Sequence, residues 1–444
     1  MTETTETGSA ATDAYRRDRS FWGMTATQFL GAFNDNVFKQ LILLLCVDYK
    51  LHHELASDPY QSTAQALFAL PFVLFSGVAG WLADRISKQT VVVWAKVAEI
   101  VVMLAGMAAF LSAEVYSDTL ITLLFCVLCL MSLQSAFFGP SKYGILPELF
   151  AKHDLPAVNG MIQMTTFLAI IFGMAVCGAA KQWLTESGIG LWVLSAGCVG
   201  VAVIGTGTSL FVRRTPVAQP GLRLTPASFG VDKNTWRMLK ADRVLRTVLL
   251  VSCLFWFLGG VLVPVVNDFG KSQMGYQDRM TSLLAALLGL GIAAGCILSA
   301  QISRASVRFG LVRKAAGGIC VSLLGLSLLP WSGLSADGVA AGAGVLLVLL
   351  GVCSGVFVIP LQVFLQARPP AEEKGRMIGT MNLLNWTAML FSAAVYKVCS
   401  SLFTLSPAVE EGAPRSVISW TFAVMAVLIL PVGLLLRLED EPLP

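Results

Sequence analysis

Long runs of apolar residues, separated by short polar segments, follow one another along the whole chain. Each run is about 20 residues long, which is the length that an α-helix needs to cross a bilayer core of roughly 30 Å. The predicted fold is therefore an all-α integral membrane protein. The pattern predicts twelve transmembrane helices, at 22–47, 63–83, 90–112, 117–139, 158–181, 190–212, 245–267, 281–303, 311–331, 339–360, 376–400 and 416–437.

Composition agrees with this class of protein. Charged residues make up 13% of the chain and hydrophobic residues 56%, whereas roughly 25% of the residues of a soluble domain are charged. The mean hydropathy is +0.73. The cysteines lie almost all within apolar runs, and no histidine cluster has the spacing of metal ligands, so we expect no disulfide, metal or cofactor. A nucleic-acid partner is not expected either, because the basic residues lie in short loops rather than on a soluble domain.

The distribution of Lys and Arg predicts the topology. Placing the N-terminus inside puts most basic residues in cytoplasmic segments, as the positive-inside rule requires, and an even number of spans then makes both termini cytoplasmic. The longest polar interruption, rich in Pro and basic residues, falls midway and separates six spans from six. The predicted organisation is a cytoplasmic tail at 1–20, a six-helix bundle at 21–212, a cytoplasmic linker at 213–244, a second six-helix bundle at 245–437 and a cytoplasmic tail at 438–444.

The two halves also resemble each other in sequence. "GWLADRISK" at 80–88 lies between spans two and three, and "AQISRASVR" at 300–308 occupies the matching place in the second half. Two six-helix pseudo-repeats with a substrate site between them are a known transporter plan. "GWLADRISK" resembles the loop signature of the major facilitator superfamily. More narrowly, "FNDN" at 33–36, "GPSKYGILPEL" at 139–149 and "VNGMIQMTTFLAIIFG" at 158–173 resemble the bacterial lysophospholipid transporter family.

This resemblance implies the major facilitator fold and a function. It implies a carrier, not an enzyme, that translocates lysophospholipid across the bacterial inner membrane by alternating access. The substrate would then be reacylated, with a cytoplasmic acyltransferase as a possible partner besides the lipid bilayer itself. One alternative is a general efflux or solute carrier of the same fold. A membrane-bound acyltransferase is a weaker alternative, because no His-Asp or nucleophile–base constellation is present.

Span one carries polar residues near its middle: Asn34, Asp35, Asn36 and Lys39. An unpaired charge at the bilayer centre costs roughly 3 kcal/mol or more, and such a residue is a functional candidate by default. Asp35 and Lys39 are spaced i, i+4, so they share one helix face and can pair. They could therefore contact the amine and the phosphate of a substrate headgroup. The alternative is a self-satisfied pair that steadies span one against a neighbour.

Further polar residues are candidates for substrate contact. Lys96 and Glu99 in span three are spaced i, i+3 and could pair, although Lys96 could instead extend to the membrane interface. Gln163, Asn382 and Asn385, with Trp386, lie in spans five and eleven. They could line a cavity or form hydrogen bonds between helices.

Candidate gating residues lie in loops on the predicted cytoplasmic side. The resemblance implies that Asp84 and Arg85 form a latch between the halves, and "FFGPSKYGILPELF" forms a turn where span four leaves the membrane. The gating candidates are Gly80, Asp84, Arg85, Lys88, Lys142, Tyr143 and Glu148. "DFGKS" at 268–272 ends like a phosphate-binding loop but lacks the preceding glycine of that motif, so nucleotide binding is not expected.

Overall fold

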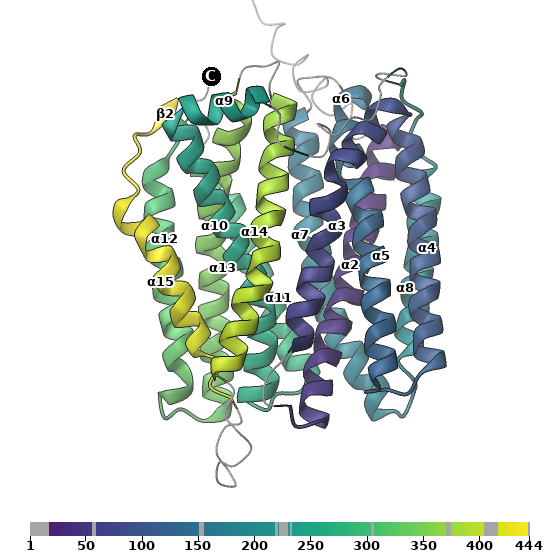
Figure 1. The fold of residues 1–444 in the computed structure, drawn as a ribbon, viewed down its shortest axis with the longest axis vertical. Coiled ribbons are helices and arrows are strands. Elements are labelled where there is room, and N and C mark those ends of the chain that lie inside the picture. The colour runs from purple at the N-terminus through teal and green to yellow at the C-terminus, as the bar shows by residue number, and fades with distance from the viewer. Residues whose placement is uncertain are drawn as a thin grey trace, which may run out of the picture.

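The structure is a computed structural model of the chain. It describes residues 17–55, 59–150, 155–217, 221, 230, 233–302, 306–369, 374–403 and 416–442. The architecture is almost entirely helical, with long helices running roughly parallel to one another (Figure 1). The elements are α2 (Arg19–His52), α3 (Pro59–Arg85), α4 (Lys88–Ser112), α5 (Asp118–Gly144), α6 (Leu146–Leu149), α7 (Leu155–Glu186), α8 (Trp192–Ser209), α9 (Lys233–Ala241), α10 (Arg243–Asp268), the π-helical turn η3 (Phe269–Gln273), α11 (Asp278–Ile302), β1 (Ser306–Val307), α12 (Phe309–Leu328), the 3₁₀ turn η4 (Leu329–Trp331), α13 (Ala336–Ala367), α14 (Lys374–Phe403), α15 (Trp420–Leu435) and β2 (Glu441–Pro442).

Each of the twelve predicted spans has a corresponding helix, which confirms the predicted fold class. Eleven helices in the described part of the chain are long and apolar enough to cross a membrane. The twelfth, α15, is apolar but has only 16 residues, and it begins at Trp420 rather than at the predicted residue 416. Helices are the expected solution because every backbone N–H and C=O inside a bilayer core must find its partner within the protein.

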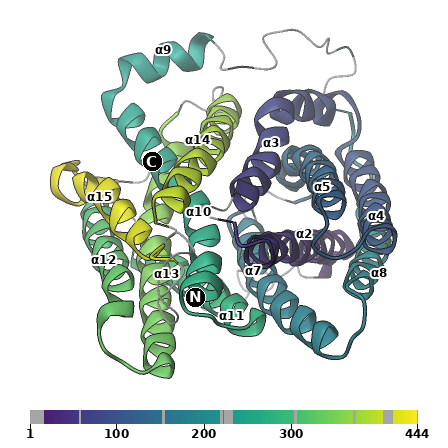
Figure 2. The same ribbon diagram turned by 60° about the horizontal axis from the view of Figure 1, so that its bottom comes forward.

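The helices form two groups. Helices α2–α8 lie side by side in one group and α10–α15 in the other (Figure 2). Each group has its own buried apolar clusters, one centred on Leu41 and Met131 and another centred on Val265 and Phe357. The groups meet where α7 packs against α11 and α3 packs against α14. The interface between the groups is therefore the place where a central site would lie.

Small residues allow the closest helix contact in the second group. A Cβ atom at Gly291 would lie 2.3 Å from the carbonyl oxygen of Val348, and one at Gly355 would lie 2.4 Å from that of Ile292. The backbones of α11 and α13 therefore touch directly. Glycines spaced four apart permit this approach in membranes, where tight van der Waals packing replaces the hydrophobic effect as the driving force for association.

The two ends of the bundle differ. We call the end that carries α9 the linker end and the opposite end the far end (Figure 1). Helix α2 begins at the linker end, where the Asp18 side chain caps it by accepting from the Ser20 N–H at 2.8 Å and also pairs with Arg213 at 2.7 Å. Near the same end, β1 and β2 form a short antiparallel pair that joins Val307 to Glu441.

Candidate substrate and gating sites

Asp35 and Lys39 attract each other electrostatically along α2 but form no direct ion pair, and each contacts a side chain of another helix. The Asp35 Oδ2 atom accepts a hydrogen bond of 2.6 Å from Ser135 Oγ of α5. Its Oδ1 atom is buried and has no hydrogen-bond partner among the described residues. The Lys39 Nζ atom lies 4.1 Å from the centroid of the Phe68 ring of α3. Both charged groups are half-buried, which leaves each able to meet a further partner.

An aromatic cluster beside Lys39 spans the two helix groups. Phe72 of α3 stacks on Trp386 of α14, with ring centroids 3.9 Å apart and planes inclined by 3°. Phe68 lies 6.0 Å from Trp386, measured between ring centroids. The amine of Lys39 thus lies against an aromatic wall built by both groups, an arrangement that attracts a cation to the ring face.

Asn34, Lys96 and Glu99 form a polar cluster inside the first group. Glu99 forms an ion pair with Lys96 and accepts a hydrogen bond of 2.8 Å from Asn34 Nδ2. Lys96 is 2% exposed and Glu99 1% exposed, so Lys96 does not extend to the membrane interface. A Cβ atom at Gly31 would lie 2.2 Å from the Lys96 Nζ atom, so this glycine provides the room for the buried amine. Their role in substrate contact stays a prediction.

The other predicted substrate residues are dispersed. Asn36 donates to the backbone oxygen of Ala32 at 2.7 Å. Asn385 is buried and accepts from Ser252 of α10 at 3.2 Å, which is a contact within the second group. Asn382 is exposed. The side chain of Gln163 lies outside the described residues.

The predicted gating residues lie at the linker end. Lys88 pairs with Glu148 at 2.5 Å, which ties the start of α4 to α6. The Arg85 guanidinium lies 4.9 Å from the ring centroid of Trp81. A Cβ atom at Gly80 would meet nothing within 4 Å. The side chain of Asp84 lies outside the described residues, so its predicted contact with the second group stays a prediction.

Lys142 and Tyr143 belong to the same end. Lys142 is buried, and its Nζ atom donates to Thr166 Oγ1 of α7 at 3.2 Å. Thr166 in turn donates to Gln28 Oε1 of α2 at 2.6 Å. The Lys142 Nζ atom also lies 5.0 Å from the ring centroid of Tyr143, which is exposed. The polar contacts from Lys142 therefore reach from α5 through α7 to α2.

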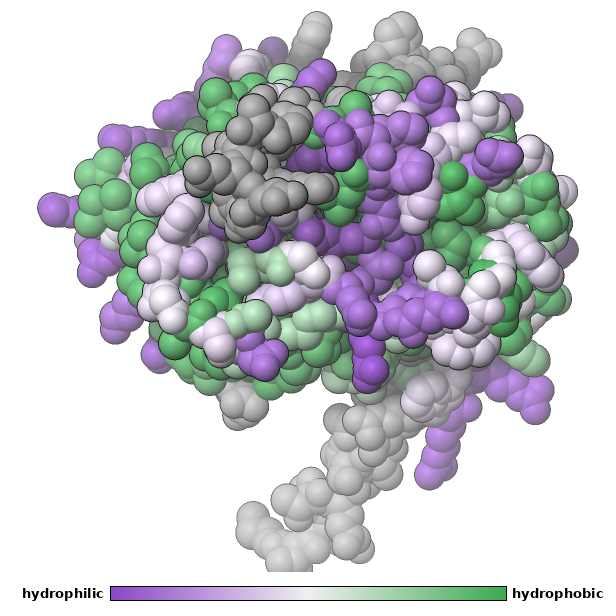
Figure 3. Space-filling view, turned by 90° about the horizontal axis from the view of Figure 1, so that it is seen from below, coloured by the Kyte–Doolittle hydropathy of each residue, from purple (hydrophilic) through white to green (hydrophobic). Residues whose placement is uncertain are grey.

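Four charged residues at the far end form a closed ring across the interface between the groups. Asp48 of α2 and Lys181 of α7 come from the first group, and Lys271 of η3 and Asp278 of α11 from the second. Lys181 pairs with Asp48 at 2.6 Å and with Asp278 at 2.5 Å. Lys271 pairs with Asp278 at 2.5 Å and also with Asp48. Each lysine thus bridges both carboxylates, and hydrophilic residues gather in the middle of this end (Figure 3).

The sign pattern of this ring has a physical consequence. Each group contributes one Lys and one Asp, and these two residues already pair within their own group. Separating the groups would break the two contacts across the interface, Lys181 with Asp278 and Lys271 with Asp48. Neither group would be left with an unpaired buried charge, and it is such an unpaired charge that makes breaking most buried ion pairs costly. The ring can hold the far end closed and still allow it to open.

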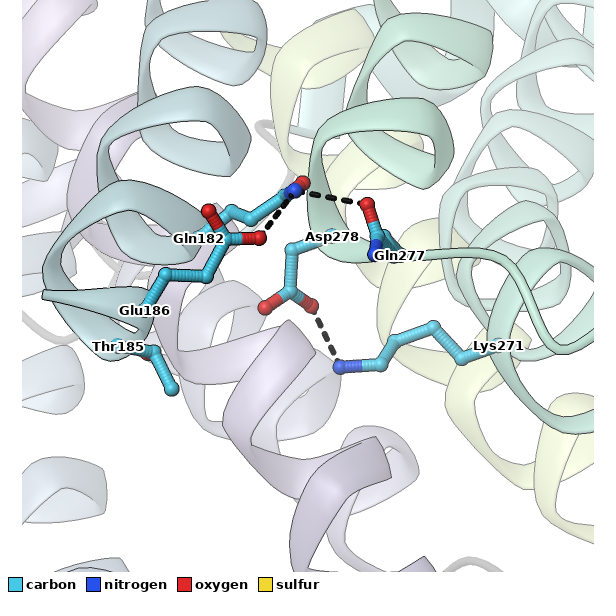
Figure 4. Close-up of a pocket in the computed structure, with 6 residues that line it drawn as sticks. All are labelled: Gln182, Thr185, Glu186, Lys271, Gln277 and Asp278. Carbon is cyan, nitrogen blue, oxygen red and sulfur yellow. Dashed lines mark hydrogen bonds and ion pairs between the residues drawn. The ribbon is translucent and has the colours of Figure 1, made fainter.

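A shallow pocket of about 210 Å³ adjoins the ring at the same end. Its wall includes a further bridge between the groups, because Gln182 Nε2 of α7 donates to Gln277 Oε1 at 2.7 Å (Figure 4). The same amide nitrogen donates to Glu186 at 2.7 Å. Polar side chains from both groups therefore line this pocket.

A second ion pair lies deeper between the groups. Lys50 of α2 pairs with Asp268 of α10 at 3.1 Å, and their side chains are 3% and 0% exposed. The Tyr396 hydroxyl of α14 lies 3.5 Å from Asp268 Oδ2, and Gln61 of α3 donates to that hydroxyl at 2.8 Å. Gln40 of α2 adds a buried hydrogen bond of 3.0 Å to Asn267. Several buried polar contacts thus join the two groups near the far end.

Comparison with known proteins identifies the family. Residues 24–394 match the sequence profile described as the Major Facilitator Superfamily. The chain belongs to the Major Facilitator Superfamily. This facilitator is therefore a multi-pass membrane transporter and not an enzyme.

Its curated relatives include bacterial proteins of one name. Lysophospholipid transporter LplT of Enterobacter sp. (strain 638) is 28% identical over 395 residues, which are 88% of this chain and 91% of the relative. Lysophospholipid transporter LplT of Yersinia pestis (strain Pestoides F) is 28% identical over 392 residues, which are 86% of this chain and 87% of the relative.

Solved structures share the fold of this facilitator at low sequence identity. A bacterial homologue of the human lysosomal transporter Spinster superposes with a TM-score of 0.67 at 14% identity, covering 94% of this chain and 96% of that one. The nucleoside transporter NupG superposes with a TM-score of 0.66 at 12% identity, covering 93% of this chain and 98% of that one. These similarities concern the arrangement of helices.

The far-end residues are not among the candidate residues that the sequence pattern indicates for this facilitator. Asp268 and Lys271 both lie in the "DFGKS" segment, whose pattern suggests only part of a phosphate-binding loop. One signal could have found them. Lys50, Lys181 and Lys271 all lie at the end that the positive-inside rule makes poor in basic residues, so each needs an explanation other than topology.

Proposed function

We propose that this transporter is a lysophospholipid carrier that works by alternating access. The narrower substrate assignment rests on the relatives named lysophospholipid transporter, which match most of the chain. The observation that carries it is the pair of partly buried, oppositely charged residues on α2, which form no direct ion pair with each other and contact Ser135 and Phe68 instead. A sugar or an apolar drug would bring no group of opposite sign to either charge.

A phospholipid headgroup that carries both a phosphate and an amine fits these groups. The buried Oδ1 atom of Asp35 can accept from an ammonium group, because Ser135 occupies only the other carboxylate oxygen. The amine of Lys39 can pair with a phosphate, exchanging its contact with the Phe68 ring for a charge-assisted hydrogen bond. The aromatic cluster of Phe72 and Trp386 provides an apolar wall beside the charged groups.

The closed far end supports a conformational cycle. The positive-inside rule favours a cytoplasmic linker end with both termini inside, so the ring of Asp48, Lys181, Lys271 and Asp278 would face the outside of a bacterial inner membrane. In this state the site would be sealed from the outer side. The bundles 21–212 and 245–437 would then move about the central site, with the candidate gating residues controlling the linker end. Reacylation by a cytoplasmic acyltransferase would make the inward flow downhill.

The test is the flip of labelled lysophosphatidylethanolamine in reconstituted vesicles. Asp35→Asn and Lys39→Gln are each expected to lower the initial rate at least about tenfold, since loss of one contact to a charged group costs roughly 1.5–3 kcal/mol. Asp337→Asn and Lys397→Gln, which remove exposed charges elsewhere, are the matched controls. The double Asp35→Asn/Lys39→Gln variant should stay inactive. If the double variant transported at the wild-type rate, the headgroup assignment would be wrong.

A competition experiment separates this proposal from a general solute carrier of the same fold. Binding of labelled lysophosphatidylethanolamine to the purified chain is measured while sugars, peptides or amphipathic drugs are added. The proposal expects competition by other lysophospholipids alone. Displacement by a water-soluble solute at similar concentration would favour the general carrier.

A further inference from the structure

Helix α9 lies across the linker end at the periphery of the second group, roughly perpendicular to the spanning helices (Figures 1 and 2). One of its faces packs against the protein. Thr235 and Leu239, spaced i, i+4, are buried, and Leu239 belongs to the apolar core of the second group. The helix is therefore anchored to α10 and α14 and not free to reorient.

The opposite face of α9 is aromatic and basic. Trp236 is 51% exposed, and Arg237 and Lys240 are exposed beside it. Arg243, the first residue of α10, is exposed just beyond the end of α9. The Lys240 Nζ atom lies 5.6 Å from the ring centroid of Trp236. Tryptophan beside basic residues is typical of a surface that sits at the headgroup level of a membrane, where the ring is half in apolar surroundings and the cations meet lipid phosphates.

No carboxylate neutralises this face from within the same segment. Asp242 is the one acidic residue between residues 233 and 246. Its Oδ1 atom accepts from the Leu245 N–H at 3.0 Å, and its Oδ2 atom accepts from Arg368 of α13 at 2.9 Å. Asp242 is thus used to cap α10 and to hold α13. The charges of Arg237, Lys240 and Arg243 are left for a partner outside the segment.

We propose that α9 is a binding surface for anionic phospholipid headgroups of the leaflet at the linker end. Charge complementarity decides between membrane lipids, because a phosphodiester without an amine, as in phosphatidylglycerol, leaves a net negative charge for the basic face. A zwitterionic headgroup brings its own cation and gains less. This surface is distinct from the central site, since α9 belongs to the linker and its exposed residues point away from the helix bundle.

The test counts lipids bound to the full-length chain by native mass spectrometry, with phosphatidylglycerol and phosphatidylcholine of equal chain length. The wild type is expected to prefer phosphatidylglycerol at least about fivefold at low salt, with a smaller preference at high salt because exposed charges are screened. The variant Arg237→Gln/Lys240→Gln/Arg243→Gln should lose this preference. Because the readout is binding of a diacyl lipid, it is independent of whether lysophospholipid is the transported substrate.

A control variant also removes three positive charges from the linker end, but away from α9. Arg308→Gln/Arg313→Gln/Lys314→Gln changes exposed residues at the start of α12 and should keep the preference within about twofold of wild type. Trp236→Ala should weaken retention of both lipids while keeping the preference. Equal loss in the two triple variants, or none in the α9 variant, would overturn the proposal. Equally tight binding of soluble glycerophosphate would also overturn it, because the partner would then be a free anion.

Discussion

Lys181 and Asp278 lie in different halves of the chain, and an ion pair of 2.5 Å joins them at the far end of the bundle. The same Lys181 also pairs with Asp48 of its own half, and Asp278 with Lys271 of its own half. The ion pair that joins the two halves therefore shares its charges with pairs inside each half, which would persist if the halves separated. The role of this four-residue ring can therefore be tested by exchanging the charges within one half.

Exchanging the charges of the first half, as Asp48→Lys/Lys181→Asp, should open the far end. The pair within that half is preserved, but both contacts across the interface become repulsive, because Lys then faces Lys271 and Asp faces Asp278. We expect the ratio of closed to open molecules to fall by about tenfold or more, which corresponds to roughly 1.4 kcal/mol. Distances between spin labels placed at the far end on the two groups measure this change.

The control for that experiment is the exchange in both halves. Adding Lys271→Asp/Asp278→Lys restores opposite charges at every contact of the ring, so the label distances should return toward those of the wild type. If the four-residue variant stayed as open as the two-residue variant, the ring would be a packing feature whose charges do not control closure.

Asp268→Asn is expected to destabilise the folded protein. It leaves the buried amine of Lys50 without its anionic partner, and breaking one side of a buried ion pair costs about 3–5 kcal/mol. The double Lys50→Met/Asp268→Asn variant removes the stranded charge and should recover much of the loss. Thermal unfolding in detergent measures both effects. A single variant as stable as the wild type would show that Lys50 finds another partner.

Gly31→Ala should displace the buried amine of Lys96. The added methyl group would meet the Nζ atom at 2.2 Å, so Lys96 would have to move away from Glu99. We expect a loss of stability of about 1–3 kcal/mol, in the range for overpacking a tight site. Gly207→Ala is the matched control, because nothing lies within 4 Å of its Cβ position. Equal thermal unfolding of the two variants would contradict the predicted role of Gly31.

The stability of the protein should depend on pH through the carboxylate of Asp242 at the start of α10. Although its partial burial favours the protonated form, the Leu245 N–H and the Arg368 guanidinium hold the pKa of Asp242 below its usual range. Because the pKa is lower in the folded state, the ionised Asp242 carboxylate stabilises the folded protein at any pH above the pKa of the unfolded chain, which is about 4. This stabilisation is lost as the pH falls through the pKa of the folded state. Asp242→Asn should therefore reduce the difference in unfolding temperature between pH 6 and pH 3 relative to the wild type.

The sequence by itself determined which segments form long apolar helices. Apolar length is a local property, so runs such as 90–112 matched α4 (Lys88–Ser112) closely. The i, i+3 pairing of Lys96 and Glu99 was equally predictable, because the spacing along one helix sets their distance. Gly291 and Gly295 of α11 are spaced four apart, as in closely packed membrane helices, and both lie against the backbone of α13.

Only the tertiary structure decided which charged groups meet across the two halves. Asp35 and Lys39 have the spacing to pair, but their direct contacts are with Ser135 and Phe68 of other helices. The far-end partners Lys50 and Asp268 are 218 residues apart in sequence. No local periodicity links residues so far apart, because their distance depends on how the two groups of helices pack, and that packing is a property of the whole fold.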